Sequence, residues 1–231
     1  MMDFLTEHYN VLWLLVLAIL GLSLIAQSQV KRVFTRYQKV PVASGKTGAQ
    51  VARELLAANG SGASVQGSSG RLSDNYNPRT HTVSLSAEVA DSCSVSAVAI
   101  AAHEVGHVLQ YEAEYLPIKL RGAILPVAQI GSQAGPYLVI FSLFLGWNSI
   151  IALIGVGLYA FATLFQLVTL PVELNASRRA LALLEDCGYI SAEQSPGAKK
   201  MLSAAASTYV LAALASFVSL LRLMVLSRRR K

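Results

Sequence analysis

One long uncharged stretch limits what this chain can fold into. Residues 122–172 contain no Asp, Glu, Lys, Arg or His, and Arg121 and Glu173 border them. One crossing of a lipid bilayer needs roughly 20 apolar residues, so the stretch is long enough for two. Gly146 to Ser149, with the sequence GWNS, form the expected turn between the crossings. The stretch therefore predicts a pair of membrane-spanning helices.

Two further segments are candidates for membrane helices. Residues 9–30 are uncharged, and the flank before them holds no Lys or Arg. A cleaved signal peptide normally begins with positive charge, so this segment predicts an anchor that is retained. Residues 201–221 are less apolar because Ala and Ser dilute them, and Arg222 follows at once. Hydrophobic residues make up 54% of the chain and charged residues only 14%, which departs from soluble proteins, and we expect four membrane helices.

The positions of Lys and Arg indicate the orientation. If the first helix begins outside the cell, most basic residues near helix ends fall on one side, which the positive-inside rule makes cytoplasmic. These residues are Lys31, Arg32, Arg36, Lys39, Lys119, Arg121, Arg178, Arg179, Lys199 and Lys200. Arg222 and the basic residues 228–231 fall on the other side if the fourth helix spans the bilayer, which contradicts the rule. The alternatives are that this helix stops short or lies at the interface. We expect the basic flanks to contact anionic lipids and not nucleic acid. The sequence has no alternation of aromatic and basic residues that would indicate an RNA- or DNA-binding surface.

Residues 31–121 form the largest polar region of the chain. The local patterns in it predict, in chain order, a helix capped by Thr47 that reaches about Ala58, a mobile Gly/Ser-rich loop over 59–70, a turn over 74–78 that leads into a strand over 80–85, and a helix from about Ser94. Cys93 and Cys187 are too few for a disulfide scaffold, and we expect both to be buried free thiols.

The sequence His103-Glu104-Val105-Gly106-His107 carries the most specific chemical signal. Residues four apart on a helix lie on one face, so the two imidazoles can bind one zinc ion. Glu104 lies beside them, where it can accept a proton from the attacking water and pass it to the leaving amine. The motif predicts peptide-bond hydrolysis by metal-activated water, with Glu104 as the general base.

A catalytic zinc site needs a third protein ligand and one open position. The extended three-histidine form would require histidine where this chain has Ala113. Glu112 and Glu114 lie too close along the same helix to turn back onto the metal. Two membrane crossings return the chain to the same face at Glu173, so this carboxylate is the expected third ligand, although a Glu at a helix start can also be an ordinary interfacial residue.

Stabilising the transition state requires a further hydrogen-bond donor aimed at the developing oxyanion. The candidate donors are Tyr76, His81, Arg178 and Arg179. Arg178 is favoured because it follows Glu173 on the same presumed helix. The strand over 80–85 is a candidate for pairing with an extended substrate by strand addition.

Three segments resemble a known family: HEVGHVLQ at 103–110, SDNYNPRTHTVSLS at 73–86 and LPVELNASRRAL at 170–181. They are similar to the YugP-like neutral zinc metallopeptidases, small bacterial membrane proteins, and the likeness runs through almost the whole chain. In that family the glutamate of the PVE motif is taken as the third zinc ligand, which implies this role for Glu173. The layout is also similar to the HtpX-type and prenyl-protein peptidases.

The chain departs from its relatives at two positions. The larger relatives carry an acidic residue four positions after the metal-binding glutamate, where it orients a histidine, and this chain has Ser177 there. Asn175 is a candidate for the same role. Family members often have histidine at the position of Asn75, so the resemblance implies no histidine function at this position.

Together these observations predict a mainly α, polytopic membrane protein with about four transmembrane helices and a small α+β cytoplasmic region that carries the HExxH helix. The expected parts are an N-terminal anchor (1–30), a cytoplasmic metallopeptidase region (31–121), a transmembrane hairpin (122–172), a cytoplasmic helix with the third zinc ligand (173–200), and a C-terminal transmembrane or interfacial helix with a basic tail (201–231).

The expected function is that of a zinc-dependent endopeptidase in the bacterial inner (plasma) membrane, with its active site facing the cytoplasm. Its expected partners are membrane-protein or peptide substrates, membrane lipids and unidentified membrane proteins. The alternative is a membrane scaffold or adaptor with a structural or vestigial zinc site. Glu104 disfavours it, because a closed structural site needs no base. A transporter with a proton relay is disfavoured by the small number of helices and the lack of an inverted repeat.

Overall fold

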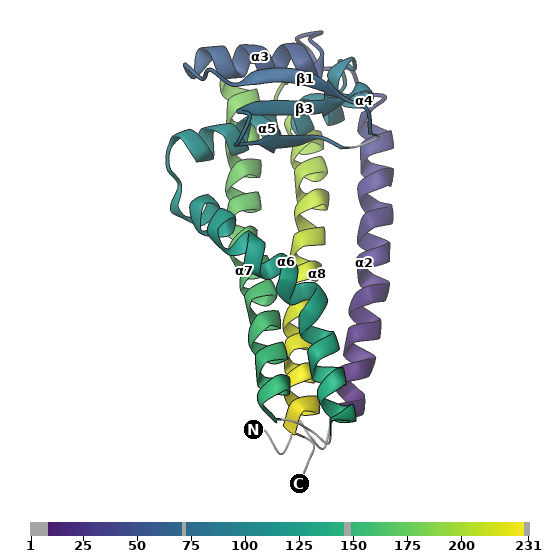
Figure 1. Ribbon diagram of the computed structural model, residues 1–231. Helices are drawn as coiled ribbons and strands as arrows, with labels where there is room; N and C mark the ends of the chain where they lie inside the picture. Colours follow the sequence, from purple (N-terminus) through teal and green to yellow (C-terminus); the bar gives the residue numbers. More distant parts are fainter. Residues whose placement is uncertain (1–8, 71–72, 146–148, 229–231) are drawn as a thin grey trace. The chain divides into compact units, whose positions relative to one another are not determined.

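The computed structural model describes residues 9–70, 73–145 and 149–228, and these residues are mainly helical (Figure 1). The elements in chain order are α2 (Tyr9–Tyr37), α3 (Gly48–Ala58), β1 (Ser64–Ser68), β2 (Asn75–Asn77), β3 (Thr82–Ser86), α4 (Ala87–Ala90), α5 (Val95–Glu112), α6 (Leu116–Phe144), α7 (Ser149–Asp186) and α8 (Ser195–Arg228). The chain forms two compact units. We call residues 1–25, 119–170 and 208–231 the helical unit, and residues 26–118 and 171–207 the α+β unit.

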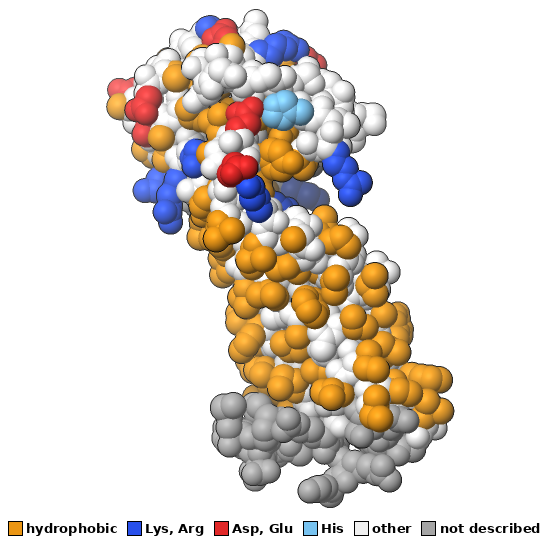
Figure 2. Space-filling view, turned by 60° about the vertical axis from the view of Figure 1, so that its left-hand side comes forward, with side chains coloured by type: hydrophobic (Ala, Val, Ile, Leu, Met, Phe, Trp, Pro, Cys, Tyr) orange, Lys and Arg blue, Asp and Glu red, His pale blue; other side chains and the backbone are white. Residues whose placement is uncertain are grey.

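Within the described residues, four helices are long and apolar enough to cross a membrane, namely α2, α6, α7 and α8. Large apolar side chains on them are exposed, and Figure 2 shows hydrophobic side chains gathered over these helices. The predicted mainly α membrane fold with a small α+β region is therefore confirmed. The expected turn at 146–149 falls mostly outside the described residues, as do the flank at 1–8 and the end of the basic tail.

α7 is a single helix that continues well beyond its apolar segment. Its 38 residues extend about 57 Å at 1.5 Å per residue, whereas the hydrocarbon core of a bilayer is about 30 Å thick. Pro171 lies inside the helix without ending it. One continuous helix thus contains both a membrane-spanning segment and Glu173, and it passes without a break through the boundary expected at residue 172.

Small residues bring α6 and α7 close together within the helical unit. A Cβ atom added to Gly131 would lie 2.0 Å from the backbone oxygen of Leu158. Gly135 and Gly155 face each other, since a Cβ on either would lie within 2.8 Å of the other's backbone oxygen. Close backbone approach through small residues is typical of membrane helix pairs, where apolar burial provides no driving force.

The α+β unit contains a three-stranded sheet in the order β1-β3-β2. β3 pairs in parallel with β1 and antiparallel with β2, so it is the central strand. A substrate strand therefore cannot be added along β3, contrary to the expectation for residues 80–85, and the outer strands provide the free edges of the described sheet. The segment 59–70, which was predicted to be a mobile loop, contains the strand β1. Its pairing with β3 and the packing of half-buried Val65 on the core outweigh the low strand propensity of Gly and Ser.

Two helices pack against the sheet to form the core, and both begin where the sequence predicts. Thr47 and Gln50 form a reciprocal capping box at the start of α3. The Ser94 side chain accepts a hydrogen bond from the backbone of Ala97 at the start of α5. The buried side chains of α3 and α5 include Val51, Leu55, Leu56, Val98 and Val105.

The two cysteines are free, as predicted, but the expectation that they are buried is wrong. Cys93 and Cys187 are both exposed. Cys93 lies just before the cap of α5, and Cys187 directly follows the end of α7. Chain segments between elements run over the surface, which explains the exposure of both thiols.

Candidate metal centre

Two helices of the α+β unit bring three metal-ligating side chains together. His103 and His107 on α5 and Glu173 on α7 each offer one ligand atom, and these atoms all lie within 4.8 Å of one another. Glu173 Oε2 is 3.2 Å from His103 Nε2 and 3.7 Å from His107 Nε2. Ligand atoms that lie 2.0–2.1 Å from a tetrahedral zinc ion are about 3.3 Å apart, so the three side chains fit this metal. We call them the triad.

Gly106 allows the close approach of α5 and α7 on which the triad depends. A Cβ atom at this position would lie 2.8 Å from the backbone oxygen of Ala176 and 3.2 Å from its Cα. Gly106 is buried, and Ala176 is fully buried on the facing side of α7. The contact places the turn of α5 between His103 and His107 directly against the turn of α7 that follows Glu173.

Each histidine of the triad is also held by a hydrogen bond on its second ring nitrogen. His103 Nδ1 lies 3.2 Å from Ser177 Oγ, and His107 Nδ1 lies 3.0 Å from Gln110 Oε1. These contacts orient the rings so that both Nε2 atoms face Glu173. Ser177 thus contacts His103, and Asn175 contacts Gln110 instead.

Gln110 was not among the site residues predicted from the sequence. The signal that indicates it is the spacing of three residues after His107. Residues three apart on a helix are neighbours on its surface, so Gln110 can reach the histidine that precedes it. Its other partners lie on α7 and have no local sequence signal.

Glu104 is buried beside the triad without belonging to its donor group. Burial raises the pKa of its carboxyl; His107 and His103 act in the opposite direction, and the charges of Glu173 and Asp74 raise the pKa further. The pKa of His107 is also raised, because the attraction of Glu173 and Glu104 outweighs the effect of burial.

The two arginines considered as oxyanion donors differ in their surroundings. Arg178 is exposed on α7. Arg179 is partly buried, and its Nε donates a hydrogen bond to Asn175 Oδ1 at 2.9 Å. Arg178 therefore has its guanidinium at the surface of the α+β unit. Arg179 instead donates to the same Asn175 oxygen that accepts a hydrogen bond from Gln110.

Tyr76 and His81, the other two candidates, contact each other and the end of α5. Tyr76 Oη lies 2.9 Å from His81 Nδ1, and His81 Nε2 lies 3.2 Å from Glu112 Oε1. Burial raises the pKa of Tyr76 to about 12, so its hydroxyl is protonated at neutral pH. Glu112 thus pairs with His81, and in the described part of the chain neither Glu112 nor Glu114 belongs to a metal-ligating group.

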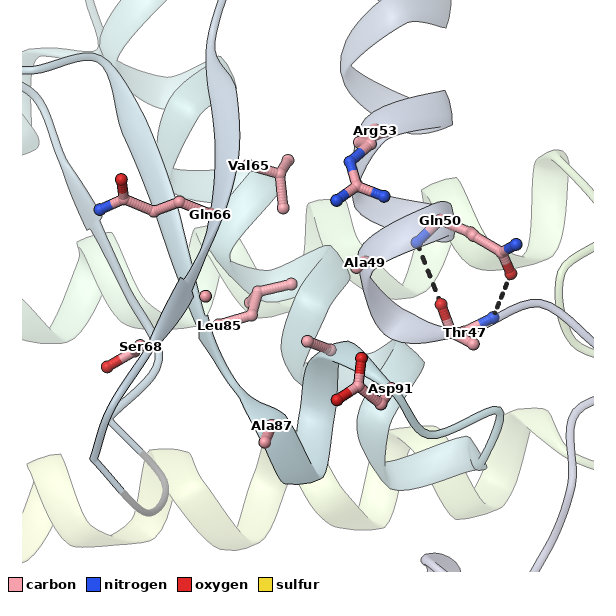
Figure 3. A pocket seen from close by; sticks show the side chains of 12 residues that line it. Thr47, Ala49, Gln50, Arg53, Val65, Gln66, Ser68, Leu85, Ala87 and Asp91 are labelled. Atoms are coloured by element: carbon pink, nitrogen blue, oxygen red, sulfur yellow. Dashed lines mark hydrogen bonds between the residues drawn. The ribbon is translucent and has the colours of Figure 1, made fainter.

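A pocket of about 400 Å³ lies in the α+β unit between α3 and β1 (Figure 3). Arg53 and the capped start of α3 form one wall, and residues 65–68 of β1 form the other. None of its lining residues belongs to the triad, and Glu104 does not line it. The residues suited to metal-dependent hydrolysis are therefore outside this pocket.

Comparison with known proteins agrees with the chemistry of the triad. The profile of the family described as "Putative neutral zinc metallopeptidase" matches residues 12–228. The chain is also 44% identical over 213 residues to a Bacillus subtilis (strain 168) protein named "Putative membrane protease YugP", which covers 92% of this chain and 94% of that protein. No solved structure matches the chain. Because the match extends over nearly the whole chain, the chain belongs to the family described as "Putative neutral zinc metallopeptidase", and the matched range contains the positions of the triad.

Proposed function

We propose that the chain is a zinc-dependent endopeptidase of the membrane, in which His103, His107 and Glu173 hold the metal and Glu104 is the general base. The observation that carries the proposal is the convergence of three donor atoms within 4.8 Å beside a buried carboxyl group that is not one of them. A structural zinc site needs no such carboxyl group. A bound zinc ion polarises the scissile carbonyl and makes a water molecule more acidic.

The residues around the triad have distinct tasks in the proposed reaction. Glu104 takes a proton from the attacking water and delivers it to the nitrogen of the leaving amine, so that one carboxyl group serves both halves of the reaction. Arg178 donates a hydrogen bond to the oxyanion that develops on the substrate carbonyl. Its exposure on α7 leaves the guanidinium accessible to a substrate.

We propose membrane proteins or peptides at the cytoplasmic face of the bacterial plasma membrane as substrates. The outer edge of β2 is the proposed place for an extended substrate strand, because β3 is already paired on both sides and β2 lies at one edge of the sheet. The orientation rests on the basic residues near the helix ends, which also contact anionic lipids in this proposal.

A set of variants in purified full-length protein tests the proposal. His103→Ala and His107→Ala should each lose stoichiometric zinc, measured by mass spectrometry, because each removes one of three protein ligands. Glu104→Gln should keep zinc but lose at least about 10²–10⁴-fold in cleavage of casein or of the protein itself, because it lacks a proton acceptor. Glu112→Gln is the matched control on the same helix and should keep both zinc and cleavage.

Two outcomes would contradict the proposal in different ways. Loss of zinc in Glu104→Gln would make Glu104 a ligand and overturn its role as a base. Full cellular function of Glu104→Gln with zinc retained would favour a membrane scaffold with a structural zinc site.

A further inference from the structure

Gln110 is a fully buried polar side chain whose amide group joins α5 to α7. Its Oε1 lies 3.0 Å from His107 Nδ1. Its Nε2 lies 2.8 Å from the backbone oxygen of Val172 and 3.0 Å from Asn175 Oδ1. The exposed fraction of Gln110 is 0%, so water cannot replace these partners.

The partners on α7 determine which way the amide of Gln110 points. The carbonyl oxygen of Val172 can only accept a hydrogen bond, so the NH₂ group of Gln110 must face it. Asn175 Oδ1 is likewise an acceptor here, because it also accepts from Arg179, whose guanidinium can only donate. The carbonyl oxygen of Gln110 is then the atom that faces His107.

This orientation in turn sets the position of the proton on His107. A carbonyl oxygen cannot donate, so Nδ1 of His107 must carry the proton that joins it to Gln110. A neutral imidazole has one proton, which leaves the lone pair on Nε2, the atom that faces Glu173. His103 differs, because its Nδ1 contacts the hydroxyl of Ser177, which can either donate or accept.

We infer that Gln110 is a positioning residue that fixes His107 in its metal-binding tautomer, while Asn175 and Arg179 hold the amide in place from α7. This inference rests on the proposed zinc site, because tautomer control matters only if His107 Nε2 binds a metal. The same amide also connects α5 to the turn of α7 that carries Glu173. One side chain therefore affects both the orientation of His107 and the position of Glu173. Partners behind a metal ligand typically contribute about 10–100-fold to metal affinity.

Zinc affinity of Gln110→Met in the full-length protein is the first test. Methionine is similar in length and apolar, but it provides no acceptor for His107. We expect the zinc dissociation constant, measured by competition with a chromophoric chelator at fixed pH, to rise about 10–100-fold. Gln194→Met is the matched control in the same unit. Gln194 accepts from the backbone of Ala43 and donates to that of Pro41, so its replacement removes similar hydrogen bonds and should leave zinc affinity unchanged.

A second measurement separates tautomer control from general stability. The chain has only 4 histidines, so a ¹⁵N-histidine NMR spectrum of the zinc-loaded protein is sparse. In the wild type, His107 should show a hydrogen-bonded Nδ1 proton that exchanges slowly with water, and in Gln110→Met this proton should exchange faster. Gln110→Glu keeps an acceptor for His107 and should recover part of the lost affinity.

If Gln110→Met fails to fold, Asn175 provides the test. Asn175→Asp keeps the acceptor for Gln110 and should bind zinc nearly as well as the wild type, whereas Asn175→Leu should bind it more weakly. Zinc affinity and a His107 proton signal that are unchanged in Gln110→Met or Asn175→Leu would overturn the inference and leave the proposed function intact. A wild-type protein that binds no zinc would overturn both.

Discussion

Gly106 lies between the two histidines of the triad, and it determines how closely α5 can approach α7. The facing atoms belong to the backbone of Ala176, which cannot move aside as a flexible side chain can. Glu173 lies one turn before Ala176 on the same helix. Any increase in the distance between the helices would therefore also move the carboxylate of Glu173 away from the histidines.

We predict that Gly106→Ala weakens the metal site although it is conservative and touches no ligand. The added Cβ would lie 2.8 Å from the Ala176 oxygen, and such overpacking typically costs about 1–3 kcal/mol. Both the Tm in detergent and the zinc affinity should fall. Gly67→Ala is the control, because no heavy atom lies within 4 Å of its added Cβ. An unchanged zinc affinity in Gly106→Ala would show that the helix contact does not control the site.

The residues that could be predicted from the sequence are those whose geometry is local. His103 and His107 follow from helix periodicity, and the structure brings them together with Glu173 in one donor group. The prediction that Glu173 is the third ligand required the membrane topology and the family resemblance in addition to local patterns. The spacing of three residues links Gln110 to His107, but the partners of Gln110 on α7 lie on another helix, and no local pattern indicates them. The role of Arg178 stays a prediction.

Among the elements, the long apolar helices and the starts of α3 and α5 were predictable, whereas α4, the break between α7 and α8, and the outer strands were not. An apolar run or a capping residue such as Thr47 or Ser94 acts within a few positions, so it can be seen in the sequence. β1 forms because it pairs with β3. The aligned partners Ser64 and Thr82 are 18 residues apart in the sequence. A Gly- and Ser-rich segment gains enough from such pairing to form a strand, which its composition alone does not indicate.

The packing of α6 on α7 gives a prediction at the scale of elements. Gly131→Ala should lower the Tm of the detergent-solubilised protein, because the Cβ would lie 2.0 Å from the Leu158 oxygen and force the two helices apart. Gly122→Ala, on the same helix, has no heavy atom within 4 Å of its Cβ. It should leave the Tm unchanged or raise it slightly, since alanine favours a helix by about 1 kcal/mol over glycine. Equal Tm values for the two variants would contradict the close contact.

At the scale of the whole molecule, the helical unit and the α+β unit are suited to different surroundings. The helical unit exposes large apolar side chains, such as Leu14 and Phe144, which are 66% and 82% exposed. The α+β unit contains the triad, both cysteines and a group of basic residues on α2, namely Lys31, Arg32, Arg36 and Lys39, which line a groove of about 390 Å³. Basic side chains beside an apolar helix are typical of the cytoplasmic face, where they contact anionic lipid head groups.

The two native thiols offer a direct test of this orientation. Cys93 and Cys187 are the only cysteines of the chain, and both are exposed in the α+β unit. A membrane-impermeant maleimide should therefore leave the protein unlabelled in intact bacterial cells whose outer envelope has been removed, and should label it once the plasma membrane is permeabilised.

The control is Leu145→Cys in a variant whose native cysteines are replaced by Ser. Leu145 directly follows α6, the second of the four candidate spans, and is exposed. If the first helix begins outside, two crossings place Leu145 outside, where the reagent should label it in intact cells. Labelling of the native thiols from outside, with Leu145→Cys protected, would reverse the orientation and place the triad on the outer face of the membrane.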